Sequence, residues 1–121
     1  PVRIMRKLIL TILLLLAACS ARLELTVAPN TKIAIRDGIK VQHIQPGTPA
    51  YQELEKWIAR NQTGWSKYYA TTPSGGIFVS DGNMTLQFSG SSVITHHNEQ
   101  TWTKPVQESE YQFLRNKLSG T

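Results

Sequence analysis

The stretch KIAIRDGIKVQHI, residues 32–44, places two apolar-rich runs on either side of the dipeptide Asp37-Gly38. Residues 32–36 and 39–44 have the composition and spacing of short β-strands. Asp-Gly favours a tight turn because both residues tolerate a positive φ. The stretch therefore predicts an antiparallel β-hairpin that turns at Asp37-Gly38.

The segments on either side of this hairpin predict one more strand and a helix. Residues 22–27 alternate polar and apolar side chains, as a half-buried strand does, and residues 28–31 end the alternation. After the turn at residues 45–47, the Thr48 hydroxyl is suited to cap a helix that starts at Pro49. Apolar residues then recur at helical spacing, namely Ala50, Tyr51, Leu54, Trp57 and Ile58.

The second half of the chain reads as short strands followed by one helix. The predicted strands are residues 65–71, 77–80, 84–88, 93–97 and 101–103, joined by short links rich in Gly, Ser and Asn. Links of this length join antiparallel neighbours, so a meander is the simplest topology. A closing helix over residues 106–118 would align Tyr111, Leu114 and Leu118 on one face. The predicted fold is α+β: an antiparallel sheet, made of a meander plus the N-terminal hairpin, with two amphipathic helices packed on one face.

The N-terminal segment has a different character from the rest of the chain. Residues 8–18 are apolar except for Thr11, and they follow Arg6 and Lys7. As a helix this run would rise only about 16 Å, whereas a bilayer core is about 30 Å thick, so the run is too short to span. Basic residues, then an apolar core, then small residues are typical of a secretory signal. We take Met5 as the natural start, with residues 1–4 upstream of it.

The signal ends in Leu16-Ala17-Ala18-Cys19, which resembles the lipobox of bacterial lipoproteins at every position. The resemblance implies cleavage between Ala18 and Cys19, a diacylglyceryl thioether on the Cys19 thiol, and acylation of the new N-terminus. Small residues before the cysteine would let a peptidase reach the backbone. The alternative is an ordinary hydrophobic helix that ends in a cysteine, although core helices carry an apolar stripe and not an apolar surface all round.

The resemblance divides the chain and predicts its location. Residues 1–18 would be the signal peptide, residues 19–22 the lipidated N-terminus with a short tether, and residues 23–121 one small periplasmic domain. In Gram-negative bacteria, aspartate after the lipidated cysteine favours the inner membrane, and Ser20 is not aspartate. For such a host we expect a lipid-anchored protein of the outer membrane that faces the periplasm.

Removal of the signal changes what composition implies. Taking residues 1–18 from the 121 leaves 103, enough for one domain with a modest core. Three of the 13 Lys and Arg residues lie in the signal, so the remaining ten face eight Asp and Glu, a net charge of +2 instead of +5. This small, scattered charge argues against nucleic acid as a partner. Cys19 is the only cysteine, so the domain has no internal disulfide.

A search for catalytic or metal-binding groups finds no constellation. His96 and His97 are adjacent on a predicted strand, so their side chains point to opposite faces, and His43 lies on another strand. No carboxylate or cysteine shows ligand spacing with them. Asp37 and Asp81 precede glycine in turns, which explains both. We expect no catalytic site, no metal and no cofactor other than the lipid on Cys19.

One aromatic and polar segment is a candidate binding surface. Alternation puts Trp65, Lys67 and Tyr69 on one face of a strand, and we add Trp102 from a later strand. Exposed Trp and Tyr are typical of binding surfaces. The alternative is that one set of aromatic side chains packs under a helix and the other under the hairpin.

These observations lead to three hypotheses about function. The first is a membrane-anchored, non-enzymatic envelope lipoprotein that binds another protein, as an assembly factor or as an inhibitor or immunity protein. The second is a binder of a lipid or glycan with a pocket lined by Trp65, Tyr69 and Trp102. The third is a cell-wall hydrolase with His96 or His97 as its base, which requires a carboxylate beside the histidine.

Overall fold

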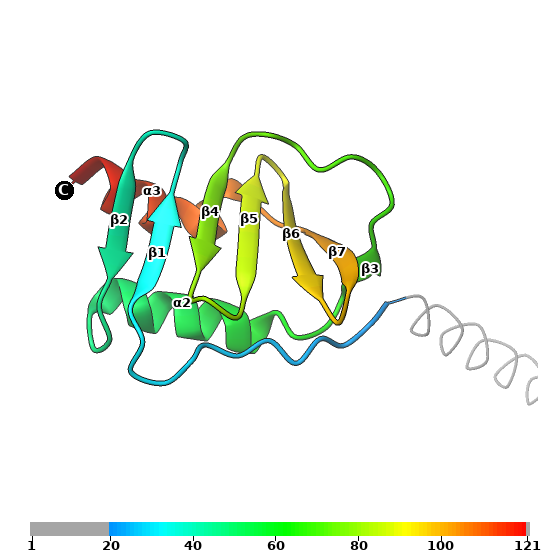
Figure 1. Cartoon of the computed structure of the whole chain (residues 1–121), viewed down its shortest axis with the longest axis horizontal. Helices are drawn as coiled ribbons and strands as arrows, with labels where there is room; N and C mark the ends of the chain where they lie inside the picture. The colour runs from blue at the N-terminus through cyan, green and yellow to red at the C-terminus, as the bar shows by residue number, and fades with distance from the viewer. Residues whose placement is uncertain (1–19, 121) are drawn as a thin grey trace, which may run out of the picture.

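A computed structural model describes residues 20–120, which form one antiparallel sheet with its helices on one side (Figure 1). The order of strands across the sheet is β2-β1-β4-β5-β6-β7-β3, and the α+β prediction is confirmed. The predicted signal peptide and the predicted lipidation site, Cys19, lie outside the described residues. The strands are β1 (Ile33–Arg36), β2 (Val41–Ile44), β3 (Ser66–Lys67), β4 (Ile77–Ser80), β5 (Thr85–Ser89), β6 (Ser92–His97) and β7 (Gln100–Pro105). The helices are α2 (Pro49–Arg60), the 3-10 helix η1 (Glu108–Tyr111) and α3 (Gln112–Gly120).

The predicted hairpin is confirmed, but its turn lies one residue later than expected. Arg36 pairs with Val41, so the turn is centred on Gly38 and Ile39 instead of on Asp37-Gly38. The Asp37 N–H donates to the Lys40 carbonyl at 3.2 Å, and the Lys40 N–H donates to the Asp37 carboxylate at 3.3 Å. Asp37 thus occupies the first position of the turn, where an aspartate side chain can accept a backbone N–H.

Helix α2 starts and packs as the sequence predicts. The Tyr51 N–H donates to the Thr48 hydroxyl at 3.4 Å, and Pro49 takes the first helical position. The apolar stripe is buried except for Ala50, which is half-buried. Within residues 20–120, no helix is long and apolar enough to cross a bilayer.

The meander is correct for β4 to β7 and wrong for the segment before it. Of the predicted strand 65–71, only Ser66–Lys67 is a strand, and it pairs with β7 at the far edge of the sheet instead of with β4. Strand β4 has β1 on one side and β5 on the other, so it offers no free side to β3, which instead forms the outer strand beside β7. Residues 68–76 therefore cross several strands between β3 and β4 (Figure 1).

Residues 22–27 show the predicted burial pattern but do not form the predicted strand. Leu23 and Leu25 are buried, and the residues between and after them are exposed. Their hydrogen-bond partner is a single residue, Gln62: its carbonyl accepts from the Leu23 N–H at 2.7 Å, and its side-chain amide bonds the Leu25 N–H and carbonyl at 3.1 and 2.9 Å. The Gln62 amide, with one acceptor and two donor hydrogens, replaces the neighbouring strand that the alternation predicted.

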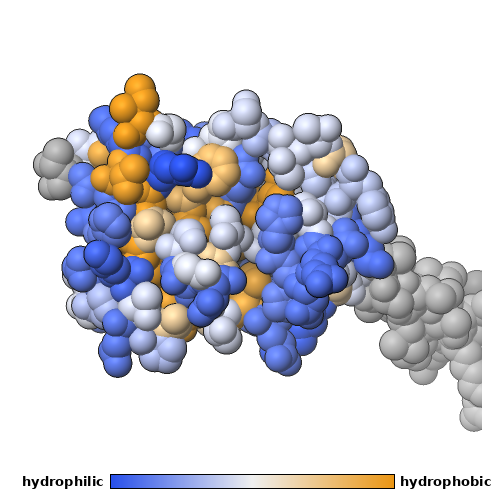
Figure 2. Space-filling model, viewed as in Figure 1, coloured by the Kyte–Doolittle hydropathy of each residue, from blue (hydrophilic) through white to orange (hydrophobic). Residues whose placement is uncertain are grey.

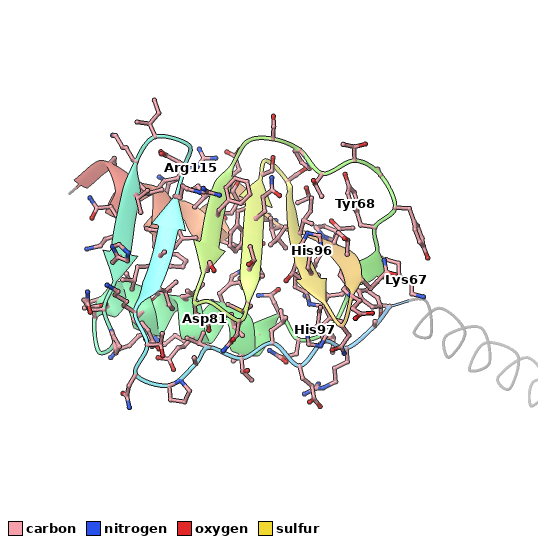
Figure 3. All side chains as sticks on the ribbon, in the orientation of Figure 1. Lys67, Tyr68, Asp81, His96, His97 and Arg115 are labelled. Carbon is pink, nitrogen blue, oxygen red and sulfur yellow. The ribbon has the colours of Figure 1, made fainter. Side chains whose placement is uncertain are left out.

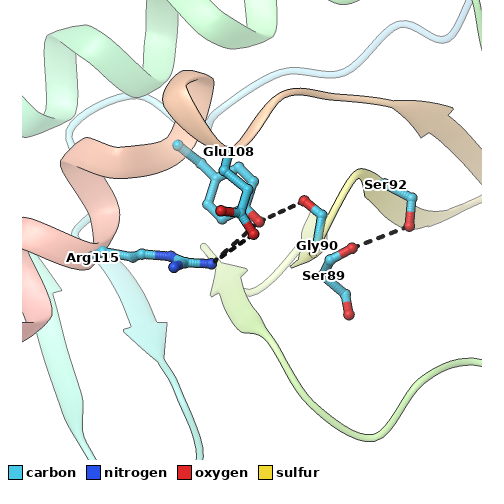
Figure 4. A network of polar contacts seen from close by, with 6 residues as sticks. Ser89, Gly90, Ser92, Glu108 and Arg115 are labelled. Atoms are coloured by element: carbon cyan, nitrogen blue, oxygen red, sulfur yellow. Dashed lines mark hydrogen bonds and ion pairs between the residues drawn. The ribbon is translucent and has the colours of Figure 1, made fainter.

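The closing helix begins as η1 and continues as α3, and the predicted face of Tyr111, Leu114 and Leu118 is buried. Figure 4 shows how this helix is tied to the β5–β6 turn. The Tyr111 hydroxyl donates to the Gly90 carbonyl at 2.7 Å, and Arg115 lies 3.4 Å from that hydroxyl and 3.6 Å from the Glu108 carboxylate.

The hydrophobic core lies between the sheet and the helices. Trp57 of α2 meets Phe88 of β5 edge to face at 5.0 Å between ring centroids, and Phe88 meets Tyr111 at 4.9 Å. In Figure 1 both α2 and α3 lie behind the sheet. One face of the sheet is thus covered by helices, and the opposite face is not.

Candidate docking surface on the open face of the sheet

The predicted aromatic surface does not exist as one patch. Trp65 is fully buried, and its indole N–H donates to the Asn61 carbonyl at 2.6 Å, so this residue belongs to the core. Trp102 is half-buried, with its indole N–H on the His97 carbonyl at 3.3 Å. Lys67, which pairs with Trp102, is exposed, and Tyr69 is 82% exposed. The prediction is wrong for Trp65, because the same alternation of aromatic residues describes a core face equally well.

The face of the sheet opposite the helices is a larger surface than the sequence indicated. Strand register places side chains of every strand on it in two rows that cross the sheet. We call these residues the open face. One row is His43, Ala34, Ser80, Thr85, His96 and Thr101; the other is Val41, Arg36, Phe78, Gln87, Ile94, Thr103 and Ser66. Neither row contains Asp or Glu, whereas Arg36 is a permanent cation.

The apolar centre of the open face lies over β1, β2 and β4. The Arg36 guanidinium carbon sits 5.1 Å from the centroid of the Phe78 ring, a cation–π geometry. Val41, 53% exposed, lies in the same row, and a shallow hollow is lined by these three residues with Ala34, Ser80 and Thr85. Figure 2 shows the hydrophobic surface gathered over this part of the sheet, with hydrophilic side chains around it.

The half of the open face over β5 and β6 is partly covered by the connection between β3 and β4. The Gln87 side-chain amide donates to the Pro73 carbonyl at 2.6 Å and to the Gly75 carbonyl at 2.9 Å. Gln87 and Ile94 are buried although they point away from the helices. The accessible part of the open face is therefore its β2-β1-β4 half.

The three histidines do not meet. His96 and His97 point to opposite faces of β6, as predicted, and His43 lies on β2, at the other edge of the sheet. His96 Nδ1 lies 2.9 Å from the Thr101 hydroxyl. Figure 3 shows Asp81 beyond the end of β4, away from both labelled histidines. Among residues 20–120, no three His, Cys, Asp or Glu side chains are grouped so that they could hold a metal ion.

Asp81 has a positioning role at the end of the sheet. Burial alone would raise the pKa of its carboxyl. The backbone N–H groups that donate to the carboxylate lower the pKa by more, so the net pKa lies below its usual value. These donors are Ala28 at 2.8 Å, Met84 at 2.7 Å and Asn83 at 2.9 Å. The carboxylate thereby fixes the β4–β5 turn and ties it to the N-terminal segment.

The residues that form the open face were not predicted as a binding surface from the sequence. The sequence pattern that could have identified this surface lies in residues 77–80, where the apolar Phe78 lies between the buried Ile77 and Val79. Such a strand has apolar residues on both faces, so one of them must lie away from the core. Comparison with protein-family models, with curated proteins and with solved structures finds no match to this chain.

Proposed function

We propose that this protein is a bacterial envelope lipoprotein, anchored by lipid on Cys19, that binds another envelope protein without catalysing a reaction. The lipobox Leu16-Ala17-Ala18-Cys19 supports the anchor. For a Gram-negative host, Ser20 supports an outer-membrane location facing the periplasm. The observation that carries the binding role is the accessible half of the open face.

The residues of the open face favour a protein as the ligand. Phe78 and Val41 offer apolar area in a shallow hollow, while Arg36 and the rows of hydroxyl groups offer hydrogen-bond donors around it. An apolar centre with a polar rim is the usual layout of protein interfaces, in which aromatic residues and Arg are enriched. The absence of carboxylates from both rows favours a partner surface that is neutral or acidic.

The lipid or glycan binder needed a pocket lined by Trp65, Tyr69 and Trp102. Because Trp65 is fully buried, these three residues do not line one pocket. The hydrolase needed a concave site that joins His96 or His97 to a carboxylate. A small hollow is lined by both histidines and by Glu24. However, among residues 20–120 no hydrogen bond or ion pair joins Glu24 to either ring, and the polar partner of the His96 ring is the Thr101 hydroxyl. The contacts of the described residues thus favour protein binding over both.

The anchor is tested by the incorporation of a tagged palmitate into cells that produce the protein. We expect the wild-type protein and a Ser20→Ala control to carry the label and the Cys19→Ala variant to lose it, because only the thiol can form the thioether. Unchanged labelling of Cys19→Ala would refute the anchor.

The binding face is tested by photo-crosslinking at single positions in living cells. A photoreactive phenylalanine analogue in place of Thr85, which is exposed on the open face, is expected to give one discrete product with a second protein. The same analogue in place of Lys56, exposed on the outer side of α2, is the matched control and is expected to give none. Products from Lys56 alone, or from neither position, would contradict the proposed face.

A further inference from the structure

The chain is fixed to the edge of the domain immediately after the proposed anchor. The Ala21 N–H donates to the Trp65 carbonyl at 2.7 Å, and the Trp65 N–H donates to the Ala21 carbonyl at 3.3 Å. Only Ser20 separates Ala21 from Cys19, and two steps between neighbouring Cα atoms span at most about 7.6 Å. If Cys19 carries lipid, as the proposed function requires, Ala21 stays within about 8 Å of the residue that bears the lipid. Trp65, about 5.5 Å across the antiparallel bridge, stays within about 13 Å of it.

The direction of the chain decides which residues lie on the anchor side. The Ala21–Trp65 bridge is antiparallel, so the chain that leaves Trp65 runs back toward the side from which residue 20 arrives. Strand β3 and residues 68–70 therefore lie on the anchor side of the bridge. In Figure 3 Lys67 lies at this edge of the sheet.

The side chains at this edge suit the boundary between lipid and water. Tyr69 is 82% exposed, which is unusual for a large aromatic residue on a small domain. Tyrosine combines an apolar ring with a polar hydroxyl and is enriched at membrane interfaces. Lys67 is also exposed, and its long apolar stem allows the ammonium to reach phosphate groups while the stem lies along apolar surface.

We propose that the edge formed by β3 and residues 68–70 rests on the headgroup layer of the phospholipid membrane, with Lys67 and Tyr69 facing the lipid. The short tether holds this edge at the headgroups, and the two side chains stabilise the contact. Strand β2 is six inter-strand spacings away, or about 29 Å at 4.8 Å each. The hairpin tip at Ile39, 99% exposed, therefore lies on the side of the domain far from the membrane.

The orientation is tested on the mature, lipidated protein in vesicles of phosphatidylethanolamine and phosphatidylglycerol. Because Cys19 is the only cysteine and its thiol is used by the lipid, one introduced cysteine is a unique labelling site. A fluorescent label on Ala70→Cys, next to Tyr69, is compared with the same label on Ile39→Cys. A lipid with a nitroxide on its headgroup serves as the quencher. The side chains of Ala70 and Ile39 are both exposed, so neither substitution disturbs the core.

We expect severalfold stronger quenching at position 70 than at position 39. Equal quenching at the two positions, weak or strong, in a protein whose mass shows the lipid on Cys19, would overturn the proposed orientation and leave the anchor intact. A mass without lipid on Cys19 would refute the anchor and the orientation with it. The mass measurement thus separates failure of the inference from failure of the proposed function.

Discussion

Replacing Gly76 by alanine is expected to destabilise the domain by about 3 kcal/mol or more. Gly76 is the last residue of the connection that crosses from β3 to β4, and its φ is +106°, a conformation that residues with a Cβ rarely adopt. A Cβ there would lie 2.2 Å from the Phe88 carbonyl oxygen, which is backbone of the paired strand β5. The clash is relieved only if β4 and β5 separate. The backbone strain at residue 76 and the lost strand pairing therefore both lower the free energy of unfolding.

The neighbouring glycine provides the matched control. A Cβ on Gly75 meets nothing within 4 Å, and its backbone is not in the positive-φ region. We expect Gly75→Ala to change the free energy of unfolding by less than about 0.5 kcal/mol, or to stabilise slightly by restricting the unfolded chain. Urea unfolding of the purified protein, followed by tryptophan fluorescence, measures both variants. Similar unfolding midpoints for the two would show that β4 and β5 are not paired as described.

Replacing Trp65 by alanine is expected to cost about 3 to 5 kcal/mol of stability. The side chain is fully buried, so the change opens a large cavity between β3 and the end of α2. It also removes the indole N–H that satisfies the Asn61 carbonyl at 2.6 Å. Loss of that bond leaves a buried acceptor unpaired at the C-terminal end of the helix.

Tyr69→Ala tests whether Tyr69 lies on the surface while Trp65, in the same predicted aromatic segment, lies in the core. With 82% of its area exposed, Tyr69 contributes little to the core, and we expect its loss to change the unfolding free energy by less than about 0.5 kcal/mol. Thermal unfolding of the two variants side by side makes the comparison. A large loss of stability in Tyr69→Ala, or a small one in Trp65→Ala, would reverse the assignment of these two residues.

Local sequence signals predicted the elements whose structure is decided locally. The cap at Thr48 with Pro49 behind it, and the apolar spacing through Ile58, define α2 because caps and helical periodicity involve residues within a few positions of one another. The hairpin and the β4 to β7 meander were predicted for the same reason, since short links leave adjacent strands few alternatives.

The predictions that were wrong concern which distant segments pair with each other. Whether residues 66–67 pair with β4 or with β7 depends on which edges other strands already occupy, and nothing in residues 65–71 encodes that. Alternation over residues 22–27 reports burial correctly but cannot say that a glutamine 37 residues away from Leu25 supplies the hydrogen bonds. The candidate site shifted for a related reason: aromatic alternation marks two faces, and only the helices decide which one is covered.

The Gln62 contacts also determine how the domain responds to mechanical force. Tension applied to the chain at residue 20 loads the Ala21–Trp65 bridge first, and then the bonds between Gln62 and residues 23 and 25. Gln62 follows Asn61, which caps α2, so the force enters the fold at the C-terminal end of that helix. The hairpin β1–β2 and the Phe78 region lie outside this force path. A pull through the proposed lipid anchor would therefore detach the N-terminal segment before it distorted the open face.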